Sequence, residues 1–219
     1  SFWILDDLNI IWDEINESTS KDEMRIYSSH PTVGYGGSGK FSLTQGTNHP
    51  LGVRLFMNIP DAEKATTIRI LDSEGKEITS YGSDAKDKSN KLDFESGMNS
   101  FVWNMRYPKA DKFDGLLMWW GTLNGPSAPP GQYTAELKIE DKTVKTPFEI
   151  LLDPRSEGTA EDRQVQFEFL LGIRNKLDET HDAIRNMRDI KSQISSLNSR
   201  IDKDKFTDVI KEGERLDSL

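Results

Sequence analysis

The central part of the chain alternates apolar and polar residues with a period of two. In the first clear example, Leu51, Val53, Leu55 and Met57 fall on one face of a predicted strand. The alternation recurs at 68–70, 101–107, 133–139 and 144–152, and residues 71–79 predict a hairpin with its turn at 73–75. Such a period places one row of side chains in a core and the other in solvent, as in antiparallel sheets. Roughly seven strands of this kind predict an immunoglobulin-like β-sandwich.

The segments around these strands give weaker signals. Residues 1–5 and 24–27 predict short strands, whereas 8–23 has the polar character of a connector. Residues 28–50 are rich in Gly, Ser, Thr and Pro and predict a long loop, and the charged insert 82–96 predicts a solvated one. Pro147 favours an edge position, because proline has no N–H to donate to a neighbouring strand.

Beyond Asp153 and Pro154 the apolar spacing changes to three and four residues. Thr159 followed by Asp162 resembles a capping box at the start of a helix. An imperfect a/d seam follows. Its apolar members are Leu170, Ile173, Leu177, Ile184, Met187, Ile194 and Ile201, and Thr180, Lys191 and Asn198 fill the other slots. We expect a helix over 160–201, about 60 Å long, a break at 198–205, and a shorter second helix with Phe206, Val209, Ile210 and Leu216.

These patterns predict a mainly β fold with α: an immunoglobulin-like antiparallel β-sandwich followed by a C-terminal long helix or helical hairpin. The expected division is an N-terminal strand and connector at 1–47, the sandwich at 48–155, and the helical hairpin or coiled-coil segment at 156–219. The opening SFWILDD is already apolar and strand-like. We therefore expect the chain to be a fragment of a longer protein.

Composition argues against several classes of partner. The chain has 37 acidic and 28 basic residues, a net charge of −9, which argues against binding nucleic acid or anionic lipid. No apolar run approaches the roughly 20 residues that a membrane span needs. The absence of cysteine rules out a disulfide framework and a thiolate metal site.

One Gly-rich stretch resembles a phosphate-binding motif. GYGGSGKF at 34–41 matches G-x-x-x-x-G-K, but Phe41 stands where a phosphate loop needs Ser or Thr to bind Mg²⁺. No apolar strand precedes it and no helical pattern follows it. We interpret the stretch as a flexible loop.

The sequence gives only weak signals for groups of catalytic or metal-binding residues. A glycosidase needs two carboxyl groups about 5–10 Å apart, and the best-placed pair, Asp6 and Asp7, would point to opposite faces of a strand. His30, His49 and His181 lie in separate segments, without a second His at metal-ligand spacing, and are interpreted as loop or helix-surface residues. No Ser occupies a G-x-S-x-G elbow. We expect no catalytic residue, metal or cofactor in this chain.

Two adjacent tryptophans have two competing interpretations. Trp119 and Trp120 precede a Gly-, Ser- and Pro-rich stretch and then a strand. Because tryptophans dominate local cores, we favour packing over the open end of the sandwich. In the alternative, one of them stacks on a sugar ring or a partner, with Asn124 or Gln132 as a polar contact.

Several stretches together resemble one family. SFWILDD, NHPLGVRLFMNIP, GMNSFVWNMRYP and the run from GLLMWWG to ILLDPR resemble, in order, the C-terminal region of large bacterial sortilin-like (VPS10-type) β-propeller proteins. Those proteins are often labelled BNR-repeat glycosyl hydrolases and are common in Bacteroidetes. GMNSFVWNMRYP is also similar to the immunoglobulin-like module of flagellar hook-capping proteins.

The resemblance implies a non-catalytic accessory module of a larger secreted or periplasmic protein. It would support an upstream β-propeller of the same polypeptide and offer a surface for protein–protein contact, with a homodimer through the C-terminal helix as a further expectation. One alternative is a carbohydrate-binding module of a glycoside hydrolase that uses Trp119 or Trp120. A second alternative is part of a hydrolase active site that the propeller completes.

Overall fold

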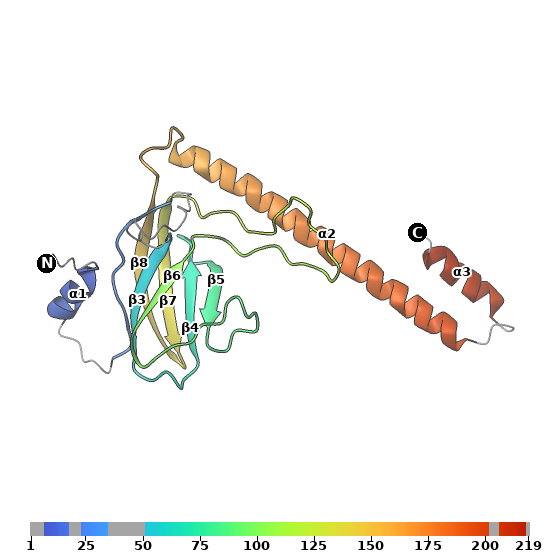
Figure 1. The fold of residues 1–219 in the computed structure, drawn as a ribbon, viewed down its shortest axis with the longest axis horizontal. Coiled ribbons are helices and arrows are strands. Elements are labelled where there is room, and N and C mark those ends of the chain that lie inside the picture. The colour runs from blue at the N-terminus through green and yellow to red at the C-terminus, as the bar shows by residue number, and fades with distance from the viewer. Residues whose placement is uncertain (1–6, 18–22, 35–50, 202–205, 218–219) are drawn as a thin grey trace, which may run out of the picture. The chain divides into compact units, whose positions relative to one another are not determined.

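The computed structural model describes residues 7–17, 23–34, 51–201 and 206–217, which contain eight strands and three helices (Figure 1). The strands are β1 (Arg25–Ile26), β2 (Thr32–Val33), β3 (Val53–Ile59), β4 (Thr66–Leu71), β5 (Glu77–Gly82), β6 (Gly97–Trp103), β7 (Gly131–Ile139) and β8 (Lys142–Leu151). The helices are α1 (Asn9–Glu17), α2 (Ala160–Arg200) and α3 (Thr207–Asp217). The predicted strand at 1–5 and the Gly-rich stretch from residue 35 onward lie outside the described residues.

The strands form two sheets of a β-sandwich. One sheet has the order β1-β3-β6 and the other β2-β8-β7-β4-β5, and β2 pairs with β8 in parallel. This confirms the predicted fold class, a mainly β sandwich followed by helix. Pro147 sits where β8 pairs with β7, and β2 reaches β8 only at Ile150 and Leu151. Proline is tolerated there because β8 has a single strand neighbour at that point among the described residues.

Alternating side chains from both sheets fill one core. Val53, Leu55 and Met57 of β3 are buried as the pattern predicts, whereas Leu51 precedes the strand and is exposed. The remaining core is drawn from the predicted faces of the other strands, principally Ile68, Ile70, Trp103, Tyr133, Ala135, Leu137, Phe148 and Ile150. Trp103 is completely buried, and its ring lies 5.9 Å from those of both Tyr133 and Phe148. Trp103, rather than a loop tryptophan, is therefore the central aromatic residue of the sandwich.

Two sequence predictions in the sandwich need correction. The alternation over 101–107 is not one strand, because Met105 has a φ of 57° and β6 ends at Trp103. The insert 82–96 is not wholly solvated, because Leu92 and Phe94 pack against the core. The hairpin turn is as predicted: Gly75 has a φ of 81°, and the Asp72 N–H donates to the Lys76 carbonyl at 2.9 Å.

The predicted connector at 8–23 contains a helix instead. Leu8 directly precedes α1, and together with Ile11, Trp12 and Ile15 of the helix it follows the i, i+3, i+4, i+7 spacing of one helical face. All four are exposed. That spacing was present in the sequence, but the surrounding polar residues obscured it.

The C-terminal helices follow the prediction closely. The capping box is formed, since the Asp162 N–H donates to Thr159 Oγ1 at 3.1 Å and the Thr159 N–H donates to Asp162 Oδ2 at 2.9 Å. The chain divides into two compact units: Ser1–Pro108 with Pro126–Phe169, and Lys109–Gly125 with Leu170–Leu219. The first holds the sandwich, and the second holds a long loop with most of α2 and all of α3.

Candidate binding loop

The loop Lys109–Gly125 lies against α2 within the second unit. Its two arms meet where the Ala110 N–H donates to the Leu123 carbonyl at 2.7 Å. Five side chains of α2 then bind the main chain of its first arm: Arg174, Asp178, His181, Arg185 and Arg188. We call these five residues the polar ladder.

The polar ladder binds backbone groups one after another. Arg174, Arg185 and Arg188 donate to the carbonyls of Lys109, Lys112 and Asp114, at 2.9, 3.1 and 2.6 Å. The Asp178 carboxylate accepts the Asp111 N–H at 2.7 Å, and His181 Nδ1 contacts the Asp111 carbonyl. A carbonyl only accepts, so Nδ1 carries a proton. The loop arm therefore needs no pairing strand to satisfy its polar groups.

The spacing of the polar ladder explains how one helix face binds an extended segment. Its members are separated by four, three, four and three residues, which keeps them on one side of a helix. Phe113 adds an aromatic contact, since its ring meets His181 edge-on at 5.2 Å and lies 4.7 Å from the Arg188 guanidinium carbon. His181 is only 4% exposed, so its interpretation as a surface residue is wrong. The loop covers it, which the sequence around His181 alone does not indicate.

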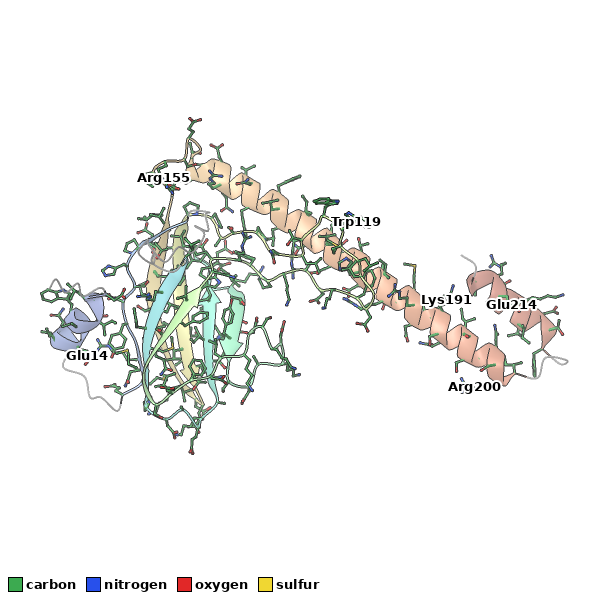
Figure 2. All side chains as sticks on the ribbon, in the orientation of Figure 1. Glu14, Trp119, Arg155, Lys191, Arg200 and Glu214 are labelled. Carbon is green, nitrogen blue, oxygen red and sulfur yellow. The ribbon has the colours of Figure 1, made fainter. Side chains whose placement is uncertain are left out.

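Beyond the ladder, the loop ends in an exposed apolar tip, Leu117–Trp120. Gly115 turns the chain with a φ of 80°, a conformation that favours glycine. Leu117, Trp119 and Trp120 are 92%, 89% and 93% exposed. Figure 2 labels the Trp119 indole among the side chains of this region. The favoured prediction that the tryptophan pair packs over the open end of the sandwich is wrong, because both indoles are almost entirely exposed.

The four predicted contact residues do not form one group within a unit. Trp119, Trp120 and Asn124 share the loop, and the Asn124 N–H donates to Thr122 Oγ1 at 3.2 Å. Gln132 belongs to β7, in the sandwich unit, where it is exposed. The polar ladder was missed in the sequence, although polar residues at 4-3-4-3 spacing on a long helix were the signal for it.

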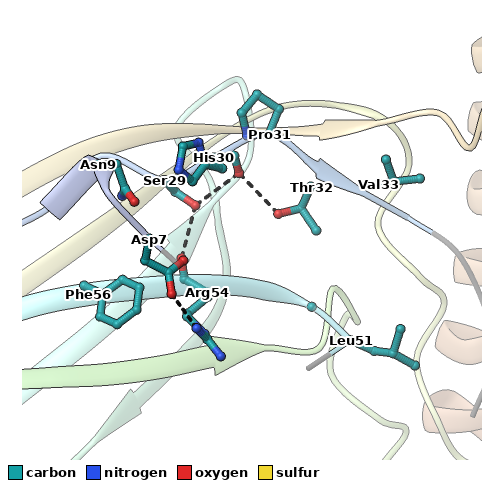
Figure 3. A pocket seen from close by; sticks show the side chains of 11 residues that line it. Asp7, Asn9, Ser29, His30, Pro31, Thr32, Val33, Leu51, Arg54 and Phe56 are labelled. Atoms are coloured by element: carbon teal, nitrogen blue, oxygen red, sulfur yellow. Dashed lines mark hydrogen bonds and ion pairs between the residues drawn. The ribbon is translucent and has the colours of Figure 1, made fainter. Parts of the chain in front are cut away.

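An open pocket on the sandwich unit is the second candidate site (Figure 3). It has a volume of about 250 Å³ and is lined by residues near α1, β2 and β3. Asp7 pairs with Arg54 at 2.5 Å, and Ser29 Oγ donates to the Arg54 carbonyl at 3.1 Å. Asp7 is the one carboxylate among the described lining residues, and its proposed neighbour Asp6 lies outside the described residues. Among the described lining residues, a two-carboxylate mechanism therefore has no second group.

Neither a metal site nor a membrane-spanning helix is found among the described residues. No cluster of three or more His, Asp or Glu side chains that could hold a metal ion occurs in residues 7–17, 23–34, 51–201 and 206–217. Within the same ranges, no helix is long and apolar enough to cross a membrane. Glu136 is only 2% exposed, and its carboxylate is paired with Arg69 and Lys145 on the sheet.

Comparisons with known proteins leave the family open. No protein-family model matches the chain, and no curated protein matches it. Among solved structures, CopC from Methylosinus trichosporium OB3b is similar over 63% of this chain and 100% of that one, with 12% sequence identity and a TM-score of 0.27. A likeness at that score supports neither a shared fold nor a shared function.

Proposed function

We propose that this chain is a non-catalytic accessory module of a larger secreted or periplasmic β-propeller protein, and that it acts by protein–protein contact. The exposed tip Leu117–Trp120 is the single observation that carries this proposal. The large apolar side chains of Leu117, Trp119 and Trp120 stand almost fully in water. Burying one such side chain contributes about 1.5–3 kcal/mol, so the tip is a favourable anchor for a partner.

The first arm of the loop, which the polar ladder holds, also supports a role in protein–protein contact. A mobile tip would lose conformational entropy on binding, which weakens the complex. Here the polar ladder holds the main chain from Lys109 to Asp114 before a partner arrives. An arm that is already held leaves fewer residues to be ordered when the tip binds, and tryptophan is enriched among the central anchors of protein interfaces.

The composition of the tip favours a protein over a sugar. Leu117 and Met118 precede the two tryptophans without a polar residue between them. Sugar sites surround a stacking ring with hydrogen-bonding groups, whereas protein anchors fill apolar pockets. The resemblance to sortilin-like propeller proteins supplies the partner: the β-propeller of the same polypeptide.

A binding measurement tests this proposal. The propeller region of the parent would be titrated against this chain by isothermal calorimetry, with Trp119→Ala/Trp120→Ala as the variant. We expect binding to weaken at least about a hundredfold, the effect of removing a pair of interface anchors. Trp12→Ala is the matched control, because Trp12 is a third exposed tryptophan, on α1. Equal affinity of the double variant and the wild type would refute the role of the tip.

A carbohydrate-binding module is the second candidate, because exposed indoles also stack on sugar rings. Trp119 or Trp120 would be the platform, and the exposed Asn124 the polar contact on the same loop. Affinity electrophoresis in soluble polysaccharide gels tests this. Retardation of the wild type that Trp119→Ala and Asn124→Ala both reduce, and Gln132→Ala leaves intact, would favour this function over protein contact.

A further inference from the structure

We propose that the outer edge of β6 accepts an extended segment of a partner protein as an added strand of the sandwich. This edge belongs to the sandwich unit, whereas the tip of the proposed function belongs to the other unit. In strand addition, main-chain hydrogen bonds supply affinity and alternate side chains supply specificity. Three features of β6 support the proposal: its outward main-chain groups, its lack of edge protection, and the apolar layer beside it.

The pairing of β3 determines which main-chain groups of β6 face outward. The Tyr27 N–H donates to the Phe56 carbonyl at 2.9 Å, so the even-numbered residues of β3 present their main chain to β1. The odd-numbered residues of β3 therefore bond to β6, where Leu55 pairs with Phe101. The residues of β6 whose N–H and C=O groups point away from β3 are Met98, Ser100 and Val102. Within the described part of the chain, these main-chain groups have no hydrogen-bond partner.

Among the described strands, β6 forms the least protected sheet edge. Natural edge strands avoid unwanted pairing by being short, by carrying charges or proline, or by lying under a covering segment. β1 and β2 have two residues each, β8 carries Pro147, and residues 90–92 pair with the end of β5 at Gly82. By contrast, β6 has seven residues, no charge, no proline and an unbroken register with β3. An edge of this kind is a template for another strand.

The second sheet extends one strand position beyond β6. The Tyr81 ring of β5 lies 4.8 Å from the Phe101 ring of β6, which places β5 opposite β6 across the core. Residues 90–92 continue the second sheet past β5, because they pair with Gly82. A strand added beside β6 would therefore lie opposite residues 90–92, at the sheet-to-sheet spacing of about 10 Å.

Half-buried apolar side chains on this side of the sandwich indicate what the added strand must carry. Leu92, Phe94, Tyr81 and Phe101 pack against the core, yet all four stay partly exposed. Successive side chains of a strand point to opposite faces, so every second residue of the incoming segment would meet this apolar layer. The occupant is therefore an extended segment with apolar residues at alternate positions.

A second copy of this chain is a poorer occupant. Two sandwiches that pair through antiparallel β6 strands would have both second sheets on the same side of the joined sheet. Residues 90–92 of one copy and β5 of the other would then need the same space, since each lies opposite the added strand. A single extended segment brings no second layer with it and avoids this collision.

A pair of synthetic peptides tests the proposal. Both have about nine residues, with alternating valine and threonine between terminal lysines, and the control peptide has N-methylated internal amides that cannot donate. Fluorescence anisotropy with the full chain is expected to show the unmodified peptide binding at least about tenfold more tightly than the control. Ser100→Pro should weaken binding by at least about tenfold, because it removes an outward N–H without touching the pairing with β3. Ser100→Thr is the matched variant, since it keeps the N–H.

Amide exchange of the wild type, followed by NMR, gives a second measurement that needs no variant. In the free chain, the amide protons of Met98, Ser100 and Val102 should exchange faster than those of Asn99 and Phe101, and the unmodified peptide should slow them. Protection of these three amides in the free chain, equal binding of both peptides, or no effect of Ser100→Pro would overturn the proposal. So would the absence of binding at about 1 mM peptide, or sedimentation of a wild-type dimer that Ser100→Pro dissociates.

Discussion

At the scale of single residues, tryptophans of this chain differ completely in environment. Trp103 is fully buried between the sheets, whereas Trp119 and Trp120 are almost fully exposed. Trp103→Ala should lower the free energy of unfolding by about 3–5 kcal/mol, because it leaves a large cavity. Trp119→Ala and Trp120→Ala should change it by less than about 0.5 kcal/mol. Urea unfolding followed by circular dichroism measures both, and a loss above about 2 kcal/mol at Trp119 would mean that the tip packs against the fold.

A second prediction at the scale of single residues concerns the buried carboxylate of Glu136. Glu136 of β7 lies opposite Arg69 of β4 and Lys145 of β8 in the sheet register. Arg69 Nε lies 2.5 Å and Lys145 Nζ 3.0 Å from its oxygens. Burial alone would raise the pKa of Glu136, but the hydrogen bonds from Lys145 and Arg69 outweigh it and lower the pKa.

The lowered pKa of Glu136 determines how the free energy of unfolding depends on pH. A folded-state pKa below the unfolded value stabilises the fold above about pH 4.3, and the stabilisation is lost as the pH falls through the lower folded-state pKa. Glu136→Gln should cost about 1–2 kcal/mol at pH 7, since both cationic partners are partly solvated. Its unfolding free energy should also fall less steeply than that of the wild type below pH 4.3. Glu77→Gln is the control, because Glu77 is an exposed carboxylate near Arg69. If the unfolding free energies of the two variants depend on pH in the same way, Glu136 does not have the stabilising role inferred here.

At the scale of elements, the loop and α2 depend on each other through the polar ladder. Asp178→Ala removes the acceptor of the Asp111 N–H. Losing a hydrogen bond to a charged group should speed amide exchange in residues 110–114 by about tenfold or more. Hydrogen-exchange mass spectrometry measures this, with Asp189→Ala as control, because Asp189 is exposed on the same helix and accepts from Gln193 rather than from a ladder residue. Unchanged exchange at 110–114 would show that the ladder does not hold the loop.

The crossing of α2 and α3 gives a second prediction at this scale. Gly213→Leu places a side chain where a Cβ already approaches Ile194 and Asn198 closely, so α3 should separate from α2 and lose its exchange protection. Gly172 of α2 has no atom within 4 Å of such a Cβ. Gly172→Ala should therefore stabilise the helix by about 0.5–1 kcal/mol through helix propensity. If α3 keeps its protection in Gly213→Leu, the close crossing is not what holds it.

At the scale of the whole molecule, the two compact units differ in which residues they need in order to keep their structure. The sandwich core is made entirely of residues in the first unit, whereas the loop Lys109–Gly125 depends on residues beyond Leu170. Deleting 170–219 should leave a cooperative unfolding transition with Trp103 in an apolar environment. It should also make trypsin cut faster at Lys109 and Lys112, because the polar ladder is gone. Equal cleavage rates in the full and shortened chains would contradict this dependence.

The sequence by itself determined the elements of this protein. Alternation over 53–57 and 133–139 predicted buried strand faces, because a period of two can satisfy only a half-buried sheet. Thr159 and Asp162 predicted the start of α2, because a capping box uses side chains a few residues apart. These signals are local, so they can be read without coordinates. The helix α1 carried the same kind of signal in Leu8, Ile11, Trp12 and Ile15, although polar neighbours obscured it.

Only the tertiary structure decided which aromatic residue fills the core and which stays in solvent. Trp103 and Trp119 are equally apolar in the sequence, and their burial depends on strands distant along the chain. The same holds for His181, which is buried because a loop some 70 residues earlier covers it. The polar ladder likewise joins side chains of one helix to backbone groups of a distant segment. The helix side of these contacts has a 4-3-4-3 spacing, but nothing in the sequence identifies the segment that it binds, because that pairing arises from where the chain returns in space.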